Sequence, residues 1–261
     1  MSYTNRLTFA IAVNDRDTFE SSFLASPCLK PPHDHEILVQ SNFSSAALAY
    51  NDVIDRAQND LIVFCHQDIL LPEGWLRRLG KILDSLEKTD PHWGVLGPYG
   101  KTKDGRGWGH VYSSGRGIIG EPFPHPVEIQ TLDEIVLILR RSSGLRFDDS
   151  LPHFHFYGTD ICLRAETMGM KSYAISAFCI HNTSQILVLP CEFYECARHI
   201  RRAWRKNLPI QTTCVRLTRF GLPVLNRRLR EFHLKHIRHK KYGGMRVADP
   251  LPLLREFAEK I

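Results

Sequence analysis

Residues 60–69 read Asp-Leu-Ile-Val-Phe-Cys-His-Gln-Asp-Ile, an apolar run that ends in three polar residues. The run at 61–65 has the length and composition of a fully buried strand. A turn is expected at His66-Gln67-Asp68, and a helix after Pro72. That helix would bury one face, because its apolar residues recur at helical spacing: Trp75, Leu79, Ile82, Leu83 and Leu86. The stretch therefore predicts a strand, a polar turn and an amphipathic helix in succession.

The same alternation of strand and helix signals extends in both directions from this stretch. Two strands are expected before it, at 7–13 and 36–40, followed by a helix at 46–57 for which two preceding serines offer an N-cap. A further strand is expected at 93–97. Strands that alternate with helices predict an α/β protein with a mostly parallel, doubly wound, Rossmann-like sheet.

The middle of the chain is less regular. Between Gly100 and Gly120 it has seven glycines among charged and aromatic residues. A connection this long and this rich in glycine predicts a mobile functional loop that becomes ordered over a ligand. The remaining pattern consists of apolar runs at 127–131 and 135–139, a helix that begins near 158–160 and ends at Gly169, and a strand region at 172–180.

The bulk composition indicates a globular protein. Of the 261 residues, 43% are hydrophobic and 24% are charged, which suits one large α/β domain. No apolar run approaches the roughly 20 residues that span a bilayer, and the first residues lack a secretory signal pattern, so a cytoplasmic location is expected. The seven cysteines include no CxxC pair. They are interpreted as reduced, packed thiols rather than a disulfide framework or a zinc site.

Positive charge is concentrated near the C-terminus. Residues 198–246 contain fifteen of the 34 Lys and Arg residues and one acidic residue, Glu231, whereas the other nineteen basic residues face twenty-seven acidic ones. We expect residues 191–261 to form a basic helical extension packed on the domain that residues 1–190 form. The charge predicts an anionic partner, such as a membrane surface that 198–246 contacts peripherally. Nucleic acid is not expected, because the segment lacks a recognised motif or stacked aromatic residues.

Three polar clusters follow predicted elements on one edge of the sheet: His66-Gln67-Asp68, Gly158-Thr159-Asp160 and His181-Asn182. In open α/β sheets ligands bind beyond the carboxyl ends of the strands. A carboxylate and an imidazole are suitable ligands for a divalent cation, and a second carboxylate could act as a general base. The same residue types also form turns, cap helices or occupy partly buried positions without any catalytic role. The clusters alone leave both interpretations open.

The motifs resemble those of a known family. Residues 60–69, with Tyr50-Asn51 before them and Leu71-Pro72-Glu73-Gly74-Trp75 after them, resemble the core of the family 2-like glycosyltransferases. His-Gln-Asp at 66–68 stands in place of the usual DxD motif. Segments 131–134, 144–148 and 154–164 and the pair His181-Asn182 are similar to later parts of the same family, in the same order. The resemblance covers about residues 7–185 and implies the GT-A fold.

The resemblance implies an inverting, metal-dependent transfer of a sugar from a nucleotide-diphosphate sugar to a saccharide, lipid-linked or protein acceptor, as in polysaccharide or glycoconjugate synthesis. Residues 1–190 would then be the donor-binding and catalytic domain. Asp68 matches the last Asp of DxD, which holds the divalent metal, manganese or magnesium, and His181 matches a late His that supplies another ligand. The implied donor-binding residues are Asn14, Asp15, His66, Gln67 and Asp68.

The catalytic base is the main departure from the family pattern. Gly158 stands where the family has the usual acidic base, and glycine cannot take a proton. Asp160 is the nearest carboxylate, at a predicted helix start where the dipole favours its ionised form. Asp133 and Glu134 are the alternatives. A second interpretation also stays open, in which a protein of this fold binds nucleotide sugars without catalysis.

Overall fold

The computed structural model describes residues 6–240 and 242–257, which fold around a seven-stranded mixed sheet. The strand order is β2-β1-β3-β11-β5-β12-β9. The bounds are β1 (Thr8–Ala12), β2 (Glu36–Gln40), β3 (Leu61–His66), β5 (Leu96–Gly97), β9 (Val127–Ile129), β11 (Val136–Arg140) and β12 (Ser172–Ala174). The α/β class and the first three strands are confirmed.

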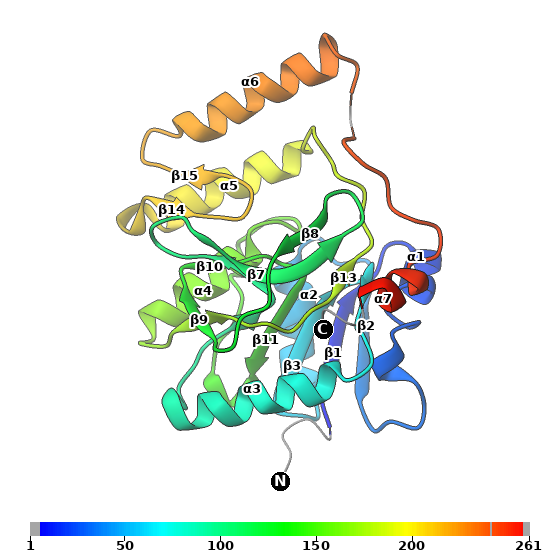
Figure 1. Ribbon diagram of the computed structural model, residues 1–261. Helices are drawn as coiled ribbons and strands as arrows, with labels where there is room; N and C mark the ends of the chain where they lie inside the picture. The colour runs from blue at the N-terminus through cyan, green and yellow to red at the C-terminus, as the bar shows by residue number, and fades with distance from the viewer. Residues whose placement is uncertain (1–5, 241, 258–261) are drawn as a thin grey trace.

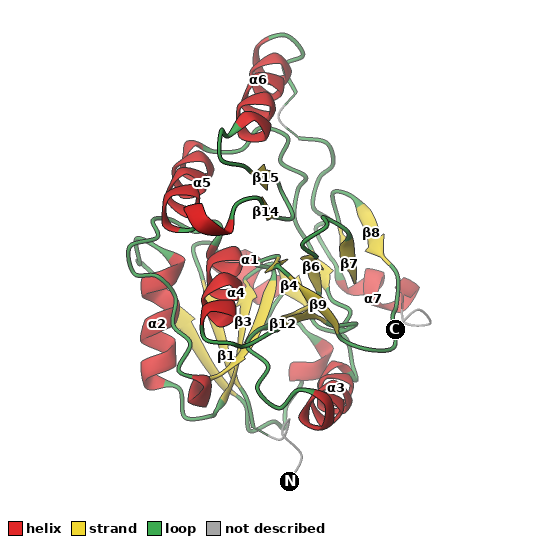
Figure 2. Ribbon diagram, turned by 90° about the vertical axis from the view of Figure 1, so that its left-hand side faces the viewer, coloured by secondary structure: helices red, strands yellow, loops and turns green. Residues whose placement is uncertain are grey.

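Helices cover both faces of this sheet (Figures 1 and 2). On one face lie α1 (Arg16–Ser21) and α3 (Trp75–Thr89), and on the other lie α2 (Ala46–Arg56) and α4 (Tyr157–Thr167). Successive residues of a strand point to opposite faces, so Ile62 and Phe64 join the core under α2 and α4 while Val63 and Cys65 join the core under α3. Three short 3₁₀ helices lie at Pro27–Leu29, Arg141–Ser143 and Arg205–Asn207.

The expectation of a mostly parallel sheet is wrong for its second half. β1 runs parallel to β2 and β3, but β11 pairs antiparallel with β3, with Val136 opposite Cys65. Among the described strands of this sheet, β11–β5 and β12–β9 are also antiparallel pairs. Parallel neighbours need a crossover connection, usually a helix, and no described helix lies between β5 and its neighbour β11. The chain turns back at the sheet edge instead.

Residues 100–120 form strands rather than the mobile loop that was expected. They contribute to a second sheet ordered β10-β6-β7-β13-β4, with β8 on β7. Its glycines allow close backbone approach: a Cβ at Gly109 would lie 2.5 Å from the carbonyl oxygen of Pro98, and one at Gly100 would lie 2.6 Å from that of Thr131. The bounds are β4 (Ile69–Leu70), β6 (Tyr99–Lys101), β7 (Gly107–Ser113), β8 (Gly117–Gly120), β10 (Thr131–Leu132) and β13 (Ile180–His181).

The C-terminal part begins with α5 (Cys191–Ala203), whose buried face joins the core of the main body through Phe193, Cys196 and Ile200. Beyond α5 lie the hairpin β14 (Ile210–Gln211) and β15 (Arg216–Leu217) and then α6 (Leu222–His236), the outermost helix in Figure 1. The chain then returns to α7 (Leu251–Phe257), where the ring of Phe257 lies 4.8 Å from that of Tyr112. Within the described ranges no helix has the length and hydropathy to cross a membrane.

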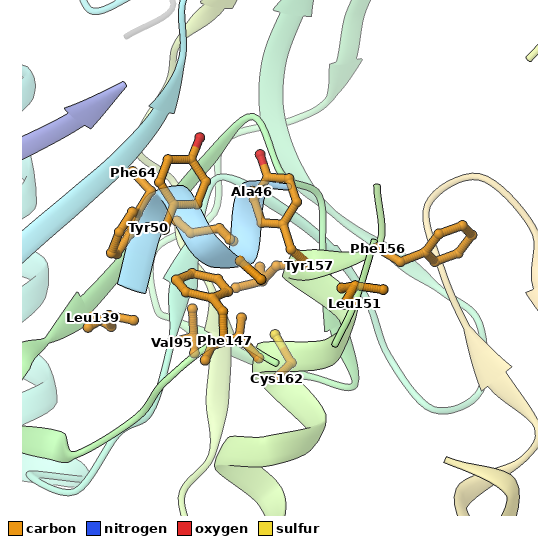
Figure 3. Close-up of a cluster of buried hydrophobic side chains, with 14 of the residues drawn as sticks. Ala46, Tyr50, Phe64, Val95, Leu139, Phe147, Leu151, Phe156, Tyr157 and Cys162 are labelled. Carbon is orange, nitrogen blue, oxygen red and sulfur yellow. The ribbon is translucent and has the colours of Figure 1, made fainter. Parts of the chain in front are cut away.

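An aromatic cluster joins α2, β3 and α4 beneath one edge of the main sheet (Figure 3). The ring of Tyr50 lies 4.9 Å from that of Phe64 and 5.4 Å from that of Tyr157, and Phe64 lies 5.3 Å from Phe147. The hydroxyls of Tyr50 and Tyr157 point to the same side. Next to them the buried Asn51 side chain donates to the carbonyl of Phe147 at 3.0 Å and accepts from its N–H at 3.0 Å.

The hydrogen bonds of Asn51 generate a stability prediction. Asn51→Ala leaves the backbone N–H and carbonyl of Phe147 buried without these partners, so the free energy of unfolding should fall by about 1–3 kcal/mol. Denaturant unfolding measures the loss. Asn226→Ala, at an exposed position of α6, is the matched control and should change it by less than about 0.5 kcal/mol. An equally small change in the free energy of unfolding of Asn51→Ala would show that these hydrogen bonds do not stabilise the fold.

Candidate functional site

Two polar turns meet at the carboxyl ends of β1 and β3. The strands pair in parallel with Ala12 opposite His66, so the residues that follow each strand lie side by side. The side chain of Gln67 joins the turns. Its Oε1 accepts from the N–H groups of Asn14 and Asp15 at 3.0 and 3.1 Å, and its Nε2 donates to Oδ1 of Asn14 at 2.6 Å. Gln67 thus fixes the position of the turn after β1 relative to the turn after β3.

Asp15 is used as a helix cap. Its carboxylate accepts from the backbone N–H of Thr18 at 3.1 Å and from the Thr18 hydroxyl at 2.7 Å, which begins α1. These hydrogen bonds, together with Arg246 at 3.6 Å, lower the pKa of Asp15 below its ordinary value. The carboxylate is therefore engaged in holding the turn after β1.

Asp68 lies between two imidazoles. Its Oδ1 is 3.3 Å from Nε2 of His181 and 3.9 Å from Nδ1 of His66. His181 is brought there by β13, which pairs antiparallel with β4, the strand that follows Asp68; the N–H of Asn182 also donates to the backbone carbonyl of Asp68 at 2.8 Å. One ligand atom from each of the three side chains lies within 4.8 Å of the others. A single cation with bonds of about 2.1 Å could be shared by all three.

The charges within this cluster are balanced in favour of an anionic Asp68. Burial alone raises the pKa of its carboxyl, but His181 and His66 outweigh that effect and lower it well below its ordinary value. Burial lowers the pKa of His66, although Asp68 opposes the shift. For His181 the attraction of Asp68 exceeds the effect of burial and raises the pKa. A carboxylate and two imidazoles suit divalent transition metals such as manganese.

Tyr157 orients the His66 ring. Its hydroxyl donates to the backbone carbonyl of Glu134 at 3.2 Å and lies 3.0 Å from Nε2 of His66. A carbonyl can only accept, so the hydrogen bond to Glu134 uses the Tyr157 hydroxyl hydrogen, and in this arrangement the Tyr157 oxygen accepts from Nε2–H of His66. The other ring nitrogen, Nδ1, then carries a lone pair and faces Asp68. No role for Tyr157 was expected from the sequence, because its contact with His66 depends on how α4 packs.

A pocket of about 490 Å³ adjoins the cluster. Of the residues expected at the donor, Asn14, His66, Gln67 and Asp68 line it, whereas Asp15 does not. The pocket is completed mainly by residues that had not been expected there: Ala12, Val13, Gln40, Asn42, Phe43, Ala49, Tyr50, Phe154 and Tyr157. They combine apolar and aromatic walls with a few amide groups, the usual character of a small-molecule site.

Glu134 fills the space beside Gly158. A Cβ added to Gly158 would lie 2.9 Å from the carbonyl oxygen of Leu132 and 3.2 Å from Cγ of Glu134. The Glu134 carboxylate accepts from the backbone N–H groups of Phe156 and Gly158 at the start of α4. Burial, helped by the neighbouring Asp133, outweighs these hydrogen bonds and raises the pKa of Glu134 to about 8. Glu134, one of the two acidic candidates after β10, therefore lies beside Gly158, the position at which the resemblance implied an acidic base.

Asp160 has a different environment. It lies in the first turn of α4 with no exposed surface. One carboxylate oxygen accepts from the indole N–H of Trp204 at 2.7 Å and the other from Nε of Arg164 at 2.7 Å. Burial raises its pKa despite these partners. Asp160 joins α4 to the end of α5, a placement that differs from the accessible base which the sequence pattern favoured.

Comparison with known proteins identifies the family. A family model described as "Glycosyltransferase like family" matches residues 8–200. The chain belongs to this glycosyltransferase-like family. Its matched part ends in α5, so it includes the sheet, the metal-ligand cluster and both acidic candidates, whereas α6 lies outside it.

Individual proteins similar to this glycosyltransferase-like chain are distant. The curated protein "ATP synthase subunits region ORF 6" of Fuscovulum blasticum is 26% identical over 167 residues, which are 61% of this chain and 66% of that protein. The mannosyltransferase PcManGT of Pyrobaculum calidifontis, solved with GDP-Man and Mn²⁺, has a TM-score of 0.47 at 12% identity over 97% of this chain and 75% of its own. S. aureus TarS 1–349 has a TM-score of 0.46 at 13% identity, with 90% and 73% covered.

Proposed function

We propose that the protein transfers a sugar, with inversion, from a nucleotide-diphosphate sugar to an acceptor hydroxyl, and that it does so on a GT-A fold. The observation that carries the proposal is the convergence of His66, Asp68 and His181 beside the 490 Å³ pocket, which His66 and Asp68 line. His66 and His181, 115 positions apart in the chain, meet there in a glycosyltransferase-like protein. A saccharide, lipid-linked or protein acceptor, in polysaccharide or glycoconjugate synthesis, and a cytoplasmic location belong to the same proposal.

The pocket suits the nucleoside part of the donor. Phe43 and Phe154 supply aromatic surface, and Phe154 is 41% exposed, so it is accessible to a base. Asn14 and Asn42 supply amide groups that can hydrogen-bond a base or a ribose. With the base against these walls, the diphosphate would lie toward Asp68 and the two imidazoles.

The residues of the cluster fit a divalent cation, manganese or magnesium. His66, Asp68 and His181 would hold it, with Nδ1 of His66 carrying the lone pair while Nε2 keeps its hydrogen and donates it to the Tyr157 oxygen. When bound, such a cation supplies Lewis-acid stabilisation of the charge on the departing nucleoside diphosphate. The protein's own contribution is to keep Asp68 ionised and to hold both rings in place.

Metal-dependent donor binding gives the first functional prediction. Asp68→Asn removes the anionic member of the cluster, so calorimetry should show loss of the manganese dependence of nucleoside-diphosphate binding while the protein stays folded. Tyr157→Phe frees the His66 ring and should weaken manganese binding by about 10–100-fold. Tyr173→Phe is the matched control, because its hydroxyl bonds Asp90, and it should leave affinity unchanged. Unchanged manganese-dependent binding in Asp68→Asn would refute the assignment.

We assign the role of general base to Glu134. A base for hydroxyl attack works best with a pKa near the operating pH, and the pKa of Glu134, raised to about 8, meets that condition. The close approach of its side chain to Gly158, the position at which the resemblance implied an acidic base, supports this assignment. Asp133 strengthens the effect through its charge. The carboxylate of Asp160 instead accepts hydrogen bonds from Trp204 and Arg164.

Glu134→Gln should lower turnover by at least about a hundredfold with donor affinity nearly unchanged, the pattern of a lost transition-state interaction. The active form is the carboxylate, so wild-type turnover should rise with pH up to about 8 and then level off; a cation in the cluster shifts this inflection downward. Single-turnover kinetics across pH measures both effects. Asp160→Asn should lower stability while the folded fraction keeps turnover within about tenfold of wild type. If Asp160→Asn loses turnover while Glu134→Gln keeps it, Glu134 is not the general base.

The competing proposal is a protein that binds nucleotide sugars without catalysis, which the glycine at position 158 favours. The two proposals agree on metal-dependent donor binding and differ in turnover. Manganese-dependent release of nucleoside diphosphate from a panel of nucleotide sugars, absent in Glu134→Gln, supports the transferase. Tight donor binding without any release supports the binding protein.

A further inference from the structure

Helix α6 presents an apolar face to solvent. Leu222, Leu225, Leu229 and Phe232 are each between 52% and 61% exposed, and Phe220 just before the helix is 83% exposed. At 100° per residue the four helical positions lie within one narrow arc. The other described residues with large apolar side chains of such exposure are Met168, Ile237 and Met245. A continuous exposed stripe of this kind marks an interaction surface.

The opposite face of α6 is attached to the protein. Glu231 is buried, accepts from the Tyr194 hydroxyl at 2.5 Å and the N–H of Leu189 at 3.2 Å, and pairs with Arg227 at 2.8 Å. Arg227 also donates to the carbonyl of Cys214 at 3.1 Å. These contacts fix the rotation of the helix about its axis. The apolar stripe is therefore held outward rather than left free to turn into the core.

Basic residues border the stripe. Residues 216–240 contain eight Arg and Lys residues, and their one acidic residue, Glu231, is the buried one that Arg227 neutralises. The exposed cations include Arg228, Arg230 and Lys235. An exposed apolar stripe with cationic flanks is the pattern of a helix that lies in the plane of an anionic membrane interface.

The stripe lies beyond the end of the sheet that carries the candidate site. In Figure 1 β1 runs upward to α1, and α5 and α6 lie above the sheet with α6 outermost; Figure 2 shows α6 at the same extreme. The site residues follow β1 and β3, at this same end of the strands. A membrane surface bound to α6 would thus lie on the side of the molecule at which β3 ends and Asp68 follows.

We infer that α6 binds the protein to an anionic lipid surface, with Leu222, Leu225, Leu229 and Phe232 inserted among the acyl chains and the flanking cations at the headgroups. A second copy of the chain is a less suitable partner, because it would bring two strongly basic helices together. A nucleic acid would leave the apolar stripe without a partner. The inference does not depend on sugar transfer, and it favours a lipid-linked acceptor among those proposed.

Vesicle sedimentation with the full-length protein tests the inference without donor or acceptor. Wild type should bind vesicles of phosphatidylcholine with phosphatidylglycerol and not vesicles of phosphatidylcholine alone. Leu225→Gln/Leu229→Gln should lower partitioning to the anionic vesicles by at least about tenfold. Leu24→Gln/Met168→Gln, a matched change at exposed apolar positions away from α6, should stay within about twofold of wild type. Arg230→Gln/Lys235→Gln should weaken binding and reduce its sensitivity to salt.

Three outcomes overturn the inference. If the wild-type protein does not bind anionic vesicles at low salt, a lipid surface is not the partner of α6. A Leu225→Gln/Leu229→Gln variant that binds as wild type does shows that the stripe is not inserted. Wild type that sediments as a dimer, with this variant monomeric, shows that a second copy covers the stripe. Vesicle binding and nucleotide-sugar chemistry are read out separately, so failure of one leaves the other test intact.

Discussion

The candidate site depends on the turn at the end of β3. The strand is buried and paired on both sides, with β1 parallel and β11 antiparallel to it, so the position of His66 is fixed by two sets of backbone hydrogen bonds. Gln67 then holds the turn after β1, and Asp68 begins the connection to β4, whose partner β13 carries His181. An error of one residue in the β3 register would move these side chains to the opposite face. The candidate metal cluster of His66, Asp68 and His181 and the pocket beside it both depend on this one register.

The balance of charge at the turn explains why such a polar group of side chains can be partly buried. An unpaired buried carboxylate is costly, whereas Asp68 faces two imidazoles that favour its ionised form. For Glu134, the proposed general base, the reverse arrangement holds: it lies near another acid, and burial raises its pKa. The pKa values of Asp68 and Glu134 are thus shifted in opposite directions, which suits the proposed roles of anionic ligand and proton acceptor.

The sequence predicted those features that local pattern determines. The run at 61–65 gave β3, the serines gave the N-cap of α2 at Ser45, and strand ends brought Asn14 and Gln67 together. The predictions were wrong where contacts between distant parts of the chain determine the structure. The glycines at 100–120 serve close strand packing, and a glycine count does not distinguish that from mobility. Asp160 has the spacing of a helix-start carboxylate, but its burial depends on Trp204, forty-four residues away. The positive charge of residues 198–246 could be read from the sequence. The outward orientation of the apolar face of α6 could not, because it depends on the hydrogen bonds of Glu231.

The most direct test of the account is anomalous diffraction from crystals grown with Mn²⁺ and a nucleoside diphosphate. The account predicts an anomalous peak within bonding distance of Asp68 and of at least one of the two imidazoles, with the diphosphate on its pocket side and the base near Phe43 and Phe154. A peak at any other group of side chains, or a nucleotide bound with no manganese at Asp68, would contradict it.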